Sequence, residues 1–139
     1  MEMDKMQIII FKLLDKYYAL RTDSVEEITK YTDYTRVPNA PDWVTGLINL
    51  RGYVVTLLDL ASLLKVDAPL EYNNIIICNH QEEKIGLLVE EIIGVREIEE
   101  NMVRRFKKDM KAELLGIVQM KDYIVNVIDL EKLLTENEG

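Results

Sequence analysis

The stretch GLINLRGYVVTLLDLASLL at residues 46–64 recurs further along the chain as GIVQMKDYIVNVIDLEKLL at residues 116–134. Seven of the 19 aligned positions are identical, and most of the others exchange one apolar residue for another. A repeat of this kind indicates two related structural units in one chain. We therefore expect two halves, over roughly residues 7–66 and 73–134.

The repetition continues upstream of these two stretches. IIIF at residues 8–11 corresponds to IIIC at residues 75–78, and VEEI occurs both at residues 25–28 and at residues 89–92. The spacing between matching segments changes by a few residues there, as it does when loops differ in length. Most of each half therefore takes part in the repeat.

Each half consists of short apolar, β-branched runs separated by turn residues, a pattern typical of strands. Five strands in each half predict an all-β fold of two small barrels side by side, a first barrel over roughly 7–66 and a second over roughly 73–134. Exchange of strands between the two barrels stays open. The expected strands are 7–14, 17–21, 25–29, 47–50 and 53–58 in the first half, and 73–79, 84–89, 92–98, 114–119 and 123–128 in the second.

The repeated stretch itself predicts a hairpin followed by a short helical turn. Two apolar runs flank the dipeptide Arg51-Gly52, where glycine permits a positive φ. Asp59 and Asp129 each precede a short leucine-rich run, 60–64 and 130–134, and are well placed to N-cap a helix there. The repeated aspartates therefore have a structural explanation.

Composition limits the classes of function. The chain has 139 residues, of which 48% are hydrophobic and 30% charged, as in a globular protein. It has no apolar run of the roughly 20 residues that a bilayer-spanning helix needs, so we expect no membrane insertion. The N-terminal residues MEMDK lack the features of a secretory signal. We expect a cytoplasmic protein.

The net charge of −8 argues against nucleic acid as a partner, because the phosphate backbone repels an acidic body. One segment opposes this mean: Arg104–Lys111 contains five basic residues and one acidic residue. It is either a solvated loop that leads into the second repeat or an electrostatic docking patch.

Motifs for catalysis are missing from the sequence. It contains no glycine-rich phosphate loop, no CxxC and no HExxH, and it has one histidine, His80, and one cysteine, Cys78. Two residues do not complete a zinc site. We therefore expect no metal, no cofactor and no enzymatic activity, and a protein that works through binding. The alternative is a small-ligand-binding or hydrolytic β-barrel protein whose site lies in the cleft between the lobes, near Cys78, His80 and Tyr53 or Tyr123.

Several motifs resemble those of the CheW family, adaptors that couple chemoreceptors to the histidine kinase CheA. The motifs are Val37-Pro38, Ala40-Pro41, Trp43-Val44, Gly46, the run INLRG at residues 48–52, and Asp59-Leu60. The resemblance implies a single CheW-like domain over residues 1–139 with two five-stranded SH3-like barrels and a hydrophobic groove between them. It also implies a non-enzymatic scaffold that is recruited to receptor arrays at the membrane.

The resemblance further implies which residues meet the partners. The partners would be the cytoplasmic tip of a chemoreceptor, which is a helical hairpin, and the regulatory domain of CheA. Arg51 matches the receptor-coupling arginine of the family, and apolar walls of the groove would take a helix stripe. The implied receptor-binding residues are Val25, Glu27, Ile28, Gly46, Asn49, Arg51, Gly52 and Val95.

Overall fold

Ten strands and two short α-helices make up the part of the chain that the computed structural model describes, residues 4–69, 71–105 and 113–137. The strands of the first half are β1 (Lys5–Leu13), β2 (Lys16–Arg21), β3 (Val25–Lys30), β4 (Val44–Leu50) and β5 (Tyr53–Asp59), followed by α1 (Leu60–Leu63). Those of the second half are β6 (Asn74–His80), β7 (Glu83–Val89), β8 (Glu91–Glu99), β9 (Leu114–Gln119) and β10 (Ile124–Ile128), followed by α2 (Leu130–Asn137). Single 3₁₀ turns follow β2 at Thr22–Ser24 and β8 at Glu100–Met102.

The predicted all-β class and the ten predicted strands are confirmed, with bounds that shift by at most three residues. The helix predicted at 130–134 extends to Asn137, while that predicted at 60–64 ends at Leu63. Most of the basic segment Arg104–Lys111 lies outside the described residues.

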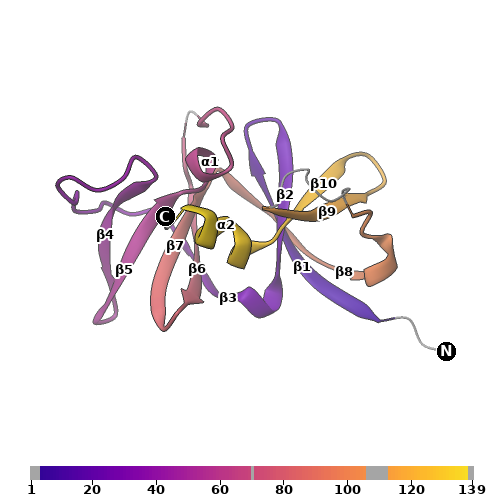
Figure 1. Ribbon diagram of the computed structural model, residues 1–139, viewed down its shortest axis with the longest axis horizontal. Helices are drawn as coiled ribbons and strands as arrows, with labels where there is room; N and C mark the ends of the chain where they lie inside the picture. Colours follow the sequence, from indigo (N-terminus) through magenta and orange to yellow (C-terminus); the bar gives the residue numbers. More distant parts are fainter. Residues whose placement is uncertain (1–3, 70, 106–112, 138–139) are drawn as a thin grey trace.

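The strands form two five-stranded sheets that lie side by side, with α2 crossing between them (Figure 1). Sheet A has the order β8-β1-β2-β10-β9, and sheet B has the order β3-β6-β7-β5-β4. The orders become identical when each strand is replaced by its counterpart in the other half. Each sheet also contains one parallel pair, β2 with β10 in sheet A and β7 with β5 in sheet B.

The predicted barrel boundaries, 7–66 and 73–134, are wrong as a description of which strands pair. Each half gives its first two strands to the sheet that holds the last three strands of the other half, so β1 and β2 pair with β8 and β10, and β6 and β7 with β3 and β5. The exchange that the sequence left open is the arrangement observed. The strand pairs that create it are far apart in sequence, and a repeat pattern fixes strand identity but not strand partners.

The exchange explains where the core lies. The buried side chains form three clusters. One lies within the barrel of sheet A, one within the barrel of sheet B, and one between the two sheets. In β1, Ile8 and Ile10 point into sheet A, while Phe11 and Leu13 point into the cluster between the sheets. In β6, Ile75 and Ile77 point into sheet B, and Ile76 and Cys78 point between the sheets. Strands buried on both faces are continuously apolar, which is why IIIF and IIIC do not alternate.

Helices α1 and α2 close the cluster between the sheets with their leucine side chains. Both begin as the sequence predicts. Asp59 accepts a hydrogen bond from the N–H of Ser62 at 3.3 Å, and Asp129 accepts one from the N–H of Lys132 at 3.1 Å. Each aspartate thus satisfies a donor at the start of its helix.

Candidate functional site

The β4–β5 hairpin ends in a tight turn that presents Arg51 to solvent. Arg51 has φ +51° and Gly52 φ +89°, the pair of positive values that a two-residue type I′ turn requires. The side chain of Asn49 supports the turn, because its Oδ1 accepts the N–H of Gly52 at 3.0 Å. The sequence assigned the positive φ to glycine alone. The two-residue length of the loop was the signal that Arg51 also has a positive φ.

Arg51 is not isolated at this tip, because its guanidinium donates a hydrogen bond to the carboxylate of Glu27. Glu27 lies on β3 and Arg51 follows β4, and these are the two outermost strands of sheet B. The ion pair therefore joins the two edges of the curled sheet. The Arg51 side chain remains 68% exposed, so its other donors face solvent. The sequence placed both residues in one site but did not predict their contact.

Val25 and Ile28 lie on the same face of β3. Val25 is opposite Cys78 and Ile28 opposite Ile76 in the register with β6, and both partners point into the cluster between the sheets. Val25 packs against that cluster, while Ile28 is 37% exposed. A β-bulge between Val25 and Glu27 makes this possible. The bulge adds one residue to the strand, so two residues instead of one separate these side chains of the same face.

The VEEI repeat would match Ile28 with Ile92, but in the strand register Val95 occupies in sheet A the position that Ile28 occupies in sheet B. It lies on the edge strand β8, opposite Ile9 of β1, and it is 46% exposed. A register shift interrupts the β1–β8 pair between Ile10 and Phe11, at the place that corresponds to the bulge in β3. Ile28 and Val95 therefore belong to different barrels, and each is an exposed apolar side chain on an edge strand, on the face turned toward the cluster between the sheets.

Gly46 lies within β4 and away from the tip. A Cβ atom there would stand 2.5 Å from the carbonyl oxygen of Thr35, which pairs with Leu47 across the strand edge. Gly116 is in the same situation, since a Cβ would stand 2.3 Å from the carbonyl oxygen of Arg104. Both repeated glycines let a chain segment cross the outer edge of a sheet.

The residues proposed for a ligand or hydrolytic site are not gathered in one cleft. Cys78 is fully buried, and burial, with a smaller effect of the Glu26 charge, raises the pKa of its thiol to about 12. His80 is also buried, with its Nδ1 3.4 Å from Glu131, whereas Tyr53 is exposed. Tyr53, His80 and Tyr123 line three separate hollows of 580, 380 and 550 Å³. A thiol with so high a pKa is a poor nucleophile at neutral pH.

Two further features are absent from the part of the chain that the structure describes. In residues 4–69, 71–105 and 113–137, no three histidine, cysteine, aspartate or glutamate side chains are arranged to hold a metal ion. Over the same residues, no helix has the length and hydrophobicity needed to cross a bilayer.

Comparison with known proteins shows which family the chain resembles. Residues 7–138 match the CheW-like domain family. The chain is similar to the chemotaxis protein CheW of Bacillus subtilis (strain 168), with 31% identity over 142 residues that cover 96% of this chain and 89% of the relative. It is also similar to the probable chemotaxis protein CheW of Rhizobium etli, with 28% identity over 139 residues that cover 96% of this chain and 90% of the relative.

A solved structure gives the same answer for the fold. The crystal structure of the scaffolding protein TtCheW from Thermoanaerobacter tengcongensis superposes with a TM-score of 0.85 at 27% identity, over 95% of this chain and 89% of that one. At this coverage the match includes residues of both barrels. The chain belongs to the CheW-like domain family, whose members are non-enzymatic scaffold proteins of chemotaxis.

Proposed function

We propose that this protein couples chemoreceptors to the histidine kinase CheA by binding the receptor tip and the regulatory domain of the kinase. It would be cytoplasmic and recruited to receptor arrays at the membrane. It would act as a scaffold, supplying surfaces rather than chemistry.

The observation that carries the proposal is the equivalence of Ile28 and Val95. Monomeric proteins expose single apolar residues without consequence. Here, however, each sheet exposes an apolar residue on the corresponding edge strand, β3 or β8, and at the same register position. A receptor tip is a helical hairpin, and an amphipathic helix binds by laying an apolar stripe between apolar walls. Val25, Ile28 and Val95 would form those walls.

The hairpin tip supports the proposal through charge. Arg51 offers solvent-facing donors in a planar fork that suits a carboxylate or backbone carbonyls of a partner. Glu27 would hold the guanidinium in place, so that less side-chain entropy is lost when the receptor binds. Asn49 and Gly52 would act through the turn that presents Arg51, and Gly46 through the strand that precedes it.

The test is calorimetry of the protein with a chemoreceptor cytoplasmic fragment and, separately, with the CheA regulatory domain. Saturable binding to both is expected. Arg51→Glu should weaken receptor binding by tenfold or more, about 1.4 kcal/mol, because it places a carboxylate beside Glu27 and removes the exposed fork. The melting temperature should change little, since exposed substitutions usually alter stability by under about 0.5 kcal/mol.

The repeat provides the matched control. Lys121 lies at the tip of the β9–β10 hairpin, at a site that resembles that of Arg51 and is also exposed. Lys121→Glu makes the same charge change and should leave receptor binding within about twofold. Equal losses from the two variants would mean that net charge, and not the β4–β5 tip, governs the interaction. Unfolding of Arg51→Glu would make Arg51 a structural residue and overturn its assignment.

A further inference from the structure

Each sheet carries a hollow at the same place, beside its parallel strand pair. The hollow of sheet A, of 550 Å³, is lined by residues of β2, β9 and β10 and of neighbouring loops. The hollow of sheet B, of 580 Å³, is lined by residues of β5 and β7 and of the turn between β6 and β7. Tyr123 and Ile124 line the first at the repeat positions of Tyr53 and Val54, which line the second.

The two hollows differ at one decisive position. Thr56 pairs with Ile85 in sheet B and Asn126 pairs with Tyr18 in sheet A, so Lys84 and Tyr17 hold equivalent places one residue earlier. The ammonium group of Lys84 lies 4.8 Å from the centre of the Tyr53 ring. In sheet A the ring of Tyr17 lies instead against the ring of Tyr123, with 4.3 Å between their centres.

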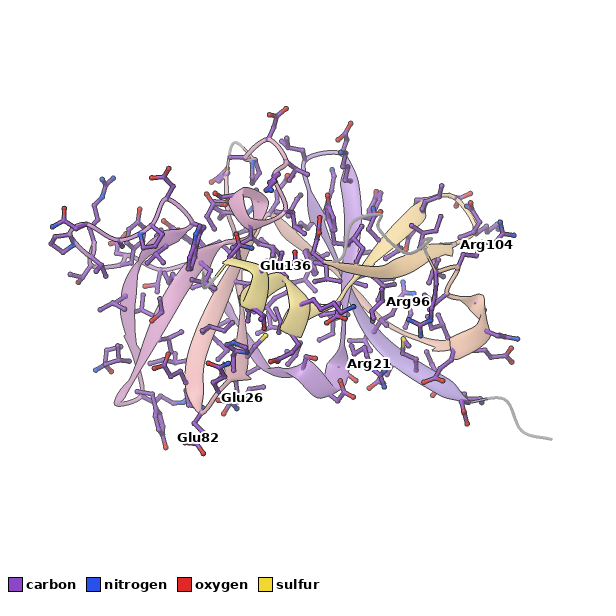
Figure 2. All side chains as sticks on the ribbon, viewed as in Figure 1. Arg21, Glu26, Glu82, Arg96, Arg104 and Glu136 are labelled. Carbon is purple, nitrogen blue, oxygen red and sulfur yellow. The ribbon has the colours of Figure 1, made fainter. Side chains whose placement is uncertain are left out.

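In sheet B, the place next to the tyrosine ring is taken by a cation, the ammonium group of Lys84. The Nζ of Lys84 touches a tyrosine face and is neutralised by Glu26, whose carboxylate oxygens are 2.6 Å away. Glu26 and Glu82 lie at the same end of sheet B (Figure 2), and Glu82 lines the hollow together with Lys84. An ammonium group, an aromatic face and a carboxylate together form a cation–π site. This site is filled from within the protein.

The hollow of sheet A has the aromatic faces and the carboxylates but a different floor. Leu64, Val66 and Leu114 give it apolar walls, and among the residues that the structure describes three carboxylates, Asp15, Glu113 and Asp122, and one lysine, Lys16, line it. Tyr18 also lines the hollow, and burial and then the charge of Asp15 raise its pKa. Volumes of 300–1,000 Å³ with apolar walls and a few polar groups are typical of small-ligand sites.

We propose that the hollow of sheet A binds a small organic cation, a substituted ammonium, against the rings of Tyr17 and Tyr123 and beside the carboxylates of Asp15 and Asp122. The two rings lie against each other, so the cation would bind beside the pair rather than between its members. The hollow of sheet B does not take such a ligand, because the ammonium group of Lys84 already occupies the face of the Tyr53 ring. This site does not depend on the receptor-coupling role.

The test uses a charged probe and its neutral isostere on the full chain. Choline and 3,3-dimethylbutan-1-ol have the same shape and differ in the charged nitrogen. Titration followed by backbone NMR should give saturable shifts for Tyr17, Tyr123 and Asp122 with choline, and binding of the neutral alcohol should be weaker by about fivefold or more. Raising the salt concentration should weaken choline binding further.

Two variants and one control locate the site. Tyr17→Lys reproduces the arrangement of sheet B and should abolish choline binding, while Tyr17→Leu should weaken it by about threefold to tenfold. Tyr53→Leu removes the ring of sheet B that corresponds to Tyr123 and should leave binding unchanged. The proposal is overturned if the alcohol binds as well as choline, if Tyr53→Leu weakens binding as much as Tyr17→Leu, or if choline produces no saturable shift in a folded sample.

Discussion

The β4–β5 and β9–β10 hairpins descend from one repeated stretch, yet their tips differ. Both begin with a glycine under a crossing chain segment and end in an aspartate that caps a helix. At the first tip, Arg51 and Gly52 have positive φ and Arg51 pairs with Glu27. At the second, Lys121 and Asp122, both within the described residues, have negative φ, and the side chain of Gln119 donates to the carbonyl oxygen of Met120 at 2.8 Å.

The shared features hold the fold, and the differing feature is the candidate site. The glycine and the aspartate solve the same packing and capping problem in each barrel. A tip that faces solvent has no such constraint. Substitutions made in matched pairs can therefore separate structure from function.

The glycine pair should give the largest effect. Gly46→Ala and Gly116→Ala each force a Cβ against a backbone carbonyl, and overpacking of this kind costs about 1–3 kcal/mol. Both variants should lower the midpoint of urea unfolding, with Gly116→Ala at least as severe because its clash is closer. A loss at Gly46 with none at Gly116 would break the equivalence of the two hairpins.

The aspartate pair should give an intermediate and unequal effect. Asp129→Ala removes one helix cap and should cost about 1 kcal/mol. Asp59→Ala should cost about 2 kcal/mol, because Asp59 also accepts the hydroxyl of Tyr72 at 2.5 Å and that half-buried group would lose its partner.

The control for the aspartate pair is Tyr72→Phe. In that background Asp59→Ala should cost no more than Asp129→Ala, as measured by thermal unfolding. If the cost of Asp59→Ala is the same with and without the Tyr72 hydroxyl, the extra stabilisation has another source.

The turn pair should give the smallest effect. Gly52→Ala places a Cβ at φ +89°, in open space but in a backbone region unfavourable to L residues, and should cost about 1 kcal/mol. Asp122→Ala, at a tip with negative φ, should stay within about 0.5 kcal/mol of the parent protein. Equal costs in chemical denaturation would show that the two turns place the same demand on the backbone.

The sequence predicted most local features for physical reasons. Apolar β-branched runs between turn residues identify strands, and this succeeded even for β1 and β6, which are buried on both faces. The helix caps followed from aspartate at the start of leucine-rich runs. The contact of Arg51 with Glu27 was beyond this reasoning, because it joins residues 24 positions apart at opposite edges of one sheet.

The candidate site likewise combines residues that the sequence indicated with an arrangement that it did not predict. The residues Val25, Ile28 and Val95 were proposed from resemblance, and their common orientation depends on two register shifts that move the side chains after them to the other face. A bulge leaves no reliable trace in a single sequence. The register therefore came from the structure alone.

The sequence by itself determined the class of fold, the number and positions of the strands, the helix caps and the family, because each depends on residues close together in the chain or on the internal repeat. Only the tertiary structure decided that the halves exchange their first two strands. It also decided which edges carry Ile28 and Val95, and that Lys84 fills one hollow while tyrosines line the other. The physical reason is that backbone hydrogen bonds are the same for any pair of strands, so the partners are chosen by the burial that the whole chain achieves at once.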